Sequence, residues 1–192
     1  SEIRVDGTLK ILAVMLALLL LGGCKGPEGE LDRAMALRAK LLASPVSFDA
    51  GITADYGDEV HNFSVYCEGD SQGNLGFRVT APETIADITG RIEGGEGKLT
   101  FRDTALAFPL LAEDQLSPVS SPWIFYQTLR SGYLTSAGME GDLLRLTIDD
   151  SYDEDALTLD IWLNEQDIPI RAEILYDGRR ILTLEIENFQ IM

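Results

Sequence analysis

Residues 157–187 read LTLDIWLNEQDIPIRAEILYDGRRILTLEIE, and this stretch decides the fold class. Apolar and polar side chains alternate along three segments of it, which is the period of a β-strand with one buried face. Asp177-Gly178 separates the last two segments and is a strong signal for a tight hairpin turn. The stretch therefore predicts three antiparallel strands in a sheet with one apolar and one solvated face.

The same alternation recurs upstream of this stretch. It predicts further strands over residues 46–54, 63–67, 75–79, 85–93, 98–101, 104–108, 133–137 and 143–148. Turn residues separate these strands, as in Tyr56-Gly57-Asp58 and Gly94-Gly95-Glu96-Gly97, and Pro82 indicates a strand end or an edge. We therefore expect about eleven antiparallel strands, enough for a sheet to curl.

Two segments have helical character instead. Leu31 to Ala43 has apolar residues at helical spacing and ends at Ser44-Pro45, because the residue before a proline is pushed out of the helical region. Pro109 to Ser121 is predicted to be a loop, and Ser121-Pro122 is predicted to be the N-cap and first residue of a helix over Trp123 to Arg130. This second helix is apolar almost all round, which is typical of a helix covered on more than one side.

A sheet with one apolar face must wrap around something apolar, and the two helices are the candidates. The predicted fold class is therefore mainly β (α+β): a curved antiparallel sheet of about eleven strands that cups two short helices. We expect residues 31–192 to form a single domain of this kind.

Residues 11–21, ILAVMLALLLL, form an apolar run that follows Arg4 and Lys10. This is the organisation of a secretory signal, and the run is too short to span a bilayer as a helix. Leu21-Gly22-Gly23-Cys24 at its end resembles the lipobox of bacterial lipoproteins. The resemblance implies a signal peptide over residues 1–23 and a diacylglycerol thioether on Cys24, followed by a tether to residue 30.

The lipobox resemblance also implies a location. A chain acylated at Cys24 would be anchored on the extracytoplasmic face of the cell membrane, in the outer leaflet of the plasma membrane if the host is Gram-positive. The alternative is an ordinary secretory signal or an N-terminal membrane anchor that happens to contain a cysteine.

The chain carries 32 Asp and Glu against 15 Lys and Arg, a net charge of −17. The predicted signal peptide holds two residues of each sign, so its removal leaves the net charge unchanged. So acidic a chain is a poor partner for nucleic acid, which needs clustered Lys and Arg. It would also be repelled by anionic lipid headgroups, and we expect a soluble, monomeric domain held to the membrane by its lipid.

The chemistry-bearing residues point away from an enzyme. The chain has one histidine, His61, and lacks HExxH, GxSxG, P-loop and GxGxxG motifs, so we expect no catalytic residues, metal or cofactor. Cys67 is interpreted as a small buried hydrophobe, with a reactive thiol as the alternative. The acidic segment 149–155, DDSYDED, is interpreted as a solvated hairpin loop, although oxygen-rich loops can hold calcium.

The order of lipobox, first helix, antiparallel meander and mid-chain helix resembles the LolA/LolB-type lipoproteins, a group that includes the mycobacterial LppX and LprG. The resemblance is strongest at residues 78–108, RVTAPETIADITGRIEGGEGKLTFRDTALAF. It implies a half-barrel with a cavity for acyl chains. The acyl-binding arginine described for LolA cannot be assigned to any one position here.

The resemblance implies a function and a set of contact residues. The chain would bind or carry an apolar ligand, lipid or acyl chains, in the concavity of the sheet. The residues expected to line the cavity are Phe48, Ile52, Phe63, Val65, Phe77, Val79, Ile88, Phe125 and Leu129. The alternatives are a solid core with no cavity, and a non-catalytic interaction module or accessory subunit of an envelope complex.

Overall fold

The structure is a computed structural model that describes residues 29–101, 104–108, 111–112 and 115–192. Its helices are α2 (Glu30–Ala43) and α3 (Ser121–Ser131), with short 3₁₀ turns at Glu83–Ile85 and Pro118–Ser120. Its strands are β1 (Val46–Asp55), β2 (Val60–Gly69), β3 (Leu75–Ala81), β4 (Thr89–Glu93), β5 (Glu96–Phe101), β6 (Thr104–Phe108), β7 (Leu111–Ala112), β8 (Gln115–Leu116), β9 (Tyr133–Glu140), β10 (Leu143–Asp149), β11 (Thr158–Leu163), β12 (Pro169–Tyr176) and β13 (Arg179–Ile191).

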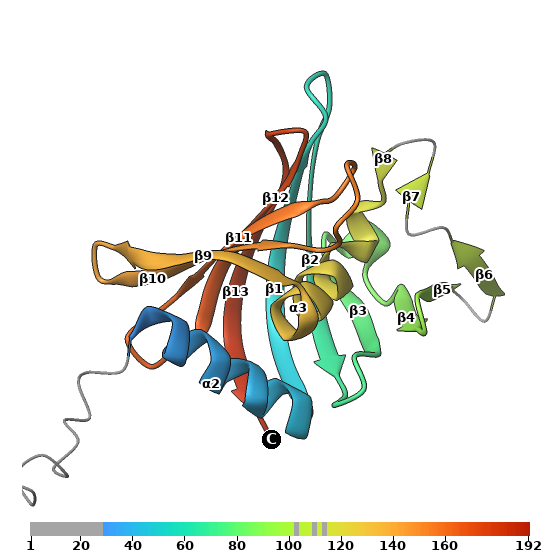
Figure 1. Ribbon diagram of the computed structural model, residues 1–192. Helices are drawn as coiled ribbons and strands as arrows, with labels where there is room; N and C mark the ends of the chain where they lie inside the picture. Colours follow the sequence, from blue (N-terminus) through green and yellow to red (C-terminus); the bar gives the residue numbers. More distant parts are fainter. Residues whose placement is uncertain (1–28, 102–103, 109–110, 113–114) are drawn as a thin grey trace, which may run out of the picture.

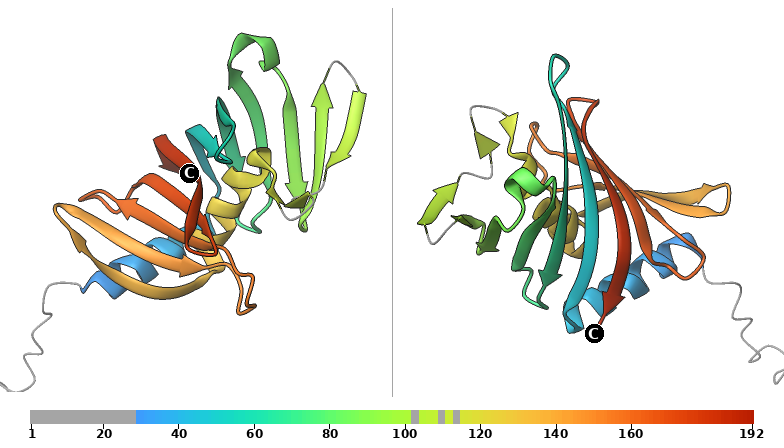
Figure 2. Two further views of the ribbon diagram at one scale, coloured as in Figure 1. Left: turned by 90° about the horizontal axis from the view of Figure 1, so that it is seen from above. Right: turned by 180° about the vertical axis from the view of Figure 1, so that it is seen from behind.

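One large antiparallel sheet dominates the described chain. Its eleven strands run in the order β6-β5-β4-β3-β2-β1-β13-β12-β11-β10-β9, and β7 and β8 form a separate pair. All neighbours along the large sheet are consecutive in the chain except β1 and β13, which pair the first described strand with the last in the middle of the sheet. The sheet stays open and bends strongly (Figures 1 and 2), so the predicted fold class is confirmed.

Both helices lie on the concave side of the sheet (Figure 1). Helix α3 packs on β10 to β13, and α2 packs on α3 and β9. Eight of the eleven residues of α3 are buried, as expected for a helix that is apolar almost all round. Helix α2 ends at Ala43, and the backbone of Ser44 is extended before Pro45, as predicted.

Helix α3 is fastened to the turn between β2 and β3 by side-chain hydrogen bonds. Three of its side chains, on one helical face, donate to backbone carbonyls of residues 70–73. The donors are Trp123 Nε1 to Gly73 O at 3.1 Å, Tyr126 Oη to Asp70 O at 2.6 Å, and Arg130 Nη2 to Ser71 O. The turn itself is closed by the Asp70 carboxylate, which accepts from the backbone N–H groups of Gln72 and Asn74.

Three predicted boundaries were wrong. The strand predicted over residues 85–93 is only β4, because a 3₁₀ turn and Asp87, with a φ of 71°, precede it and leave Ile88 in a loop. The predicted loop from Pro109 to Ser121 contains β7, β8 and a 3₁₀ turn. That turn runs directly into α3, so the helix begins at Ser121 and its N-cap is Ser120.

Candidate functional site

The nine predicted contact residues all belong to one apolar cluster between the sheet and the helices. Seven of them are buried: Phe48, Ile52, Val65, Phe77, Val79, Phe125 and Leu129. Phe63 and Ile88 are partly buried and pack against the same cluster. The structure therefore brings the nine together, and their contact with a ligand stays a prediction.

Side chains fill the middle of the concavity. Phe48 of β1 meets Phe125 of α3 edge-on at a centroid distance of 5.6 Å, and it stacks on Phe189 of β13 at 5.6 Å. The Tyr126 ring lies so close to Gly69 that a Cβ there would overlap it. Close contacts of this kind are those of a packed protein interior, so α3 rests directly on the sheet here.

The sheet continues through β3, β4 and β5, away from the strands on which the helices pack (Figure 2), and its apolar face continues with the buried Phe77, Val79 and Ile92. We call this part, residues 75–101, the arm. Its inward side chains include Phe77, whose ring occupies the space that a side chain at Gly90 would need. Ile88 and Leu99 remain only partly buried, unlike the inward residues in the middle of the sheet.

Sequence reasoning missed two of the apolar residues of the arm, Ile92 and Leu99. Ile92 is fully buried, and Leu99 packs on the core from β5. Both stand at inward positions of a period-two pattern, and that pattern was the available signal. Ile92 stands four residues after Ile88, on the same face of the predicted strand, so the pattern alone could have identified it.

The remaining sequence interpretations concern residues other than the nine predicted contacts. The lipobox, with Cys24, lies outside the described residues. Cys67 is fully buried, as predicted, and burial, with the nearby Asp49 charge, raises the pKa of its thiol well above the usual value. Neither helix in the described part of the chain is long and apolar enough to cross a membrane.

The acidic segment 149–155 is a hairpin loop whose first carboxylates bind the protein itself. Asp149 accepts a hydrogen bond from the Thr158 hydroxyl at 2.8 Å, and Asp150 accepts one from the Leu157 N–H at 2.8 Å. Burial raises the pKa of Asp150. Across the described residues, no group of three or more His, Cys, Asp or Glu side chains is arranged to hold a metal ion.

Comparisons with known proteins found likenesses of structure only. No protein-family model matches the sequence, and no curated protein does so either. A LolA superfamily protein from Nitrosomonas europaea is 10% identical, with 83% of this chain and 93% of that chain covered and a TM-score of 0.47.

Two further similar structures come from other bacteria. The lipoprotein LppX of Mycobacterium tuberculosis is 12% identical, covers 84% of this chain and 96% of its own, and has a TM-score of 0.39. A chain from the complex of the CwlD amidase with the GerS lipoprotein of Clostridioides difficile is 12% identical, with coverages of 86% and 98% and a TM-score of 0.42. Likeness at this level concerns the general arrangement of strands and helices.

Proposed function

We propose that this protein is an extracytoplasmic lipoprotein, anchored through Cys24, that binds an apolar ligand such as a lipid acyl chain on the concave side of its sheet. The observation that supports this most is the arm. Its inward apolar face continues the core beyond the strands on which α2 and α3 pack, and Ile88 and Leu99 stay partly exposed there.

The binding free energy in this proposal comes from removing apolar surface from water. Each Å² of apolar surface removed from water contributes about 25 cal/mol, so an acyl chain laid along the arm would be held by burial of both surfaces. At the start of α3, Ile124 belongs to the apolar core cluster, and the partly buried Trp123 packs against it. The ligand would therefore lie between the arm and the start of α3, with the packed middle of the sheet as its inner limit.

Native mass spectrometry of the chain from residue 25 onward, which contains every described element, tests the proposal. Leu99→Gln places an amide on the inward face of β5 and is expected to reduce the fraction of lipid-bound protein at least about threefold, because burying an unpaired amide costs about 1–3 kcal/mol. Thr80→Gln is the matched control, because Thr80 is an exposed residue of β3 whose side chain points to the face opposite the buried Val79.

The possible results distinguish an arm that binds lipid from one that does not. A bound mass that disappears on extraction into organic solvent, and that falls in Leu99→Gln but not in Thr80→Gln, supports a lipid-binding arm. A chain that stays ligand-free when phospholipid is added, or that loses lipid equally in both variants, contradicts the proposal.

A second function, as an interaction module, is favoured by the outer face of α2. Leu31, Met35 and Leu42 follow one another at helical spacing and are 57%, 50% and 53% exposed. Met139 of the neighbouring β9 is 48% exposed and contacts Arg33 of α2. Large exposed apolar side chains that adjoin one another mark surfaces that bind another protein.

Chemical cross-linking of the full-length chain in intact cells tests this second function. Met35→Glu is expected to reduce a cross-linked partner species at least about fivefold, because a buried unpaired charge is costly at an interface. Thr80→Glu, on an exposed residue of β3, adds the same charge elsewhere. A partner species that persists in Met35→Glu, or that Thr80→Glu removes equally, argues against binding through α2.

A further inference from the structure

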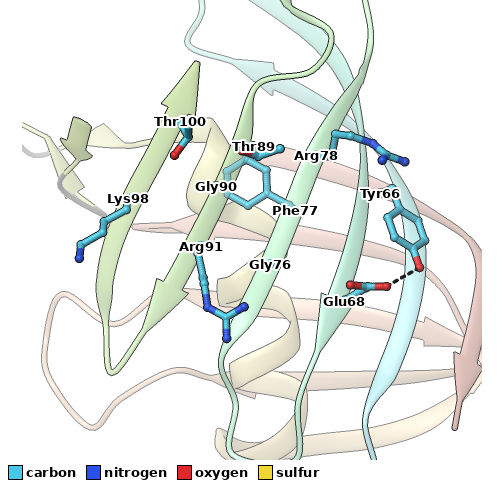
Figure 3. A pocket seen from close by; sticks show the side chains of 10 residues that line it. All are labelled: Tyr66, Glu68, Gly76, Phe77, Arg78, Thr89, Gly90, Arg91, Lys98 and Thr100. Carbon is cyan, nitrogen blue, oxygen red and sulfur yellow. Dashed lines mark hydrogen bonds between the residues drawn. The ribbon is translucent and has the colours of Figure 1, made fainter. Parts of the chain in front are cut away.

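The convex face of the arm carries a groove of about 580 Å³ that is lined by residues of β2, β3, β4 and β5 (Figure 3). In the register of these strands, the side chains that line the groove form two rows of cross-strand neighbours. One row is Tyr66, Arg78, Thr89 and Thr100, and the other is Glu68, Gly76, Arg91 and Lys98. These are outward residues of β2 and of the arm, and Phe77 and Gly90, which lie between the two rows, complete the lining.

Positive charge gathers in this groove although the chain as a whole is strongly acidic. Arg78, Arg91 and Lys98 come from three adjacent strands, in a chain with 15 Lys and Arg against 32 Asp and Glu. Arg91 and Lys98 stand directly opposite each other in the register of β4 and β5. Like charges at directly opposed positions destabilise a sheet, so this pair needs a reason other than folding.

Little within the protein neutralises these cations. In the described part of the chain, neither Arg78 nor Lys98 forms an ion pair. Arg91 pairs with Glu93 of its own strand, but the two side chains are 63% and 58% exposed, and exposed pairs contribute little. The groove therefore keeps positive charge available for an anion.

The groove also has room and neutral donors. A side chain at Gly76 would have only the Glu68 carbonyl oxygen near it, at 4.0 Å, so the glycine leaves the floor between the rows open. Thr89 and Thr100, in the same row as Arg78, add two hydroxyl groups. The one carboxylate of the lining, Glu68, accepts a hydrogen bond from the Tyr66 hydroxyl at 3.0 Å and lies at the far side from Lys98 (Figure 3).

We propose that this groove binds the phosphate group of a small phosphate ester or of a phospholipid headgroup. Arginine guanidinium groups bind phosphate oxygens with two parallel N–H donors, lysine adds a point charge, and threonine hydroxyls complete such sites. The volume exceeds that of a bare phosphate and lies within the range of about 300–1,000 Å³ for small-molecule sites. The groove uses the face opposite the proposed apolar site and does not depend on that proposal.

Isothermal titration calorimetry of the chain from residue 25 onward with glycerol 3-phosphate at low salt tests the proposal. A second assay measures co-sedimentation of the same chain with vesicles of phosphatidylglycerol or of phosphatidylcholine. Arg91→Gln and Lys98→Gln are expected to weaken binding at least about fivefold each, because each removes a charge-assisted hydrogen bond. Arg180→Gln is the matched control, because it removes the same charge from an exposed residue that pairs with Glu173.

Each outcome decides the proposal. Binding of glycerol 3-phosphate that both groove variants weaken and Arg180→Gln preserves supports a soluble phosphate ester. Binding only to phosphatidylglycerol vesicles, with the same pattern among the variants, supports a lipid headgroup. Absence of binding to both probes overturns the proposal, and so does an equal loss in Arg180→Gln, which would indicate only the overall charge.

Discussion

Phe125→Ala is expected to lower the free energy of unfolding by about 3–5 kcal/mol, the usual cost of truncating a fully buried phenylalanine. Phe125 has no exposed surface, and its ring meets Phe48 edge-on at 5.6 Å. The substitution removes this aromatic contact and leaves a void between α3 and the sheet, which closely packed neighbours cannot close. Urea denaturation of the chain from residue 25, followed by far-ultraviolet circular dichroism, measures the change.

Phe125→Leu is the matched control for this substitution. It keeps most of the apolar volume and is expected to cost less than about half as much as the alanine variant. A loss below about 1 kcal/mol for Phe125→Ala would contradict a packed core at this point. It would indicate instead that Phe125 lines an open cavity.

Arg130→Met is expected to lower the free energy of unfolding by about 2–4 kcal/mol. Arg130 is buried, and its guanidinium donates to the carbonyls of Leu41 and Ser71 and to the Gln127 side chain. The Leu41 carbonyl belongs to the last turn of α2, where no helical N–H is present to bind it. Methionine replaces the stem of the arginine but leaves both buried carbonyls without this donor.

The comparison variant is Arg180→Met, which removes an exposed arginine and is expected to change stability by less than about 0.5 kcal/mol. Equilibrium denaturation in urea compares the two. If Arg130→Met costs no more than Arg180→Met, then Arg130 does not join α2, α3 and the turn at residues 70–73 in the way described above. Retention of the wild-type m-value would show that the variant still unfolds from a comparable native state.

The amphipathic strands show why most of the fold could be predicted. In β11, β12 and β13, local alternation and the Asp177-Gly178 turn both indicate the same antiparallel arrangement, and the structure has it. Residues 82–93 show where local reasoning failed. Their apolar residues fit a strand, but the backbone at Asp87 has a positive φ, and the chain turns before β4 begins.

The two candidate sites also differ in whether the sequence alone could identify their residues. The alternation of apolar and polar residues identified the inward residues, such as Phe77 and Val79, because a strand with one buried face has an apolar residue at every second position. It did not identify the groove, because Arg78, Arg91 and Lys98 become neighbours only through the register of β3, β4 and β5. Because the strand before Gly94 was predicted to begin at residue 85 and not at Thr89, the pairing of β3 with β4 could not be derived from the sequence.

The sequence by itself determined that this chain forms an antiparallel sheet with one apolar face and two helices to cover it, because period and turn chemistry are local properties. Only the tertiary structure decided how far the helices reach along that face. The pairing of β1 with β13 and the docking of α3 on the turn at residues 70–73 join residues distant in the chain. Those contacts depend on packing in three dimensions, and they determine which apolar residues are packed away and which remain accessible on the arm.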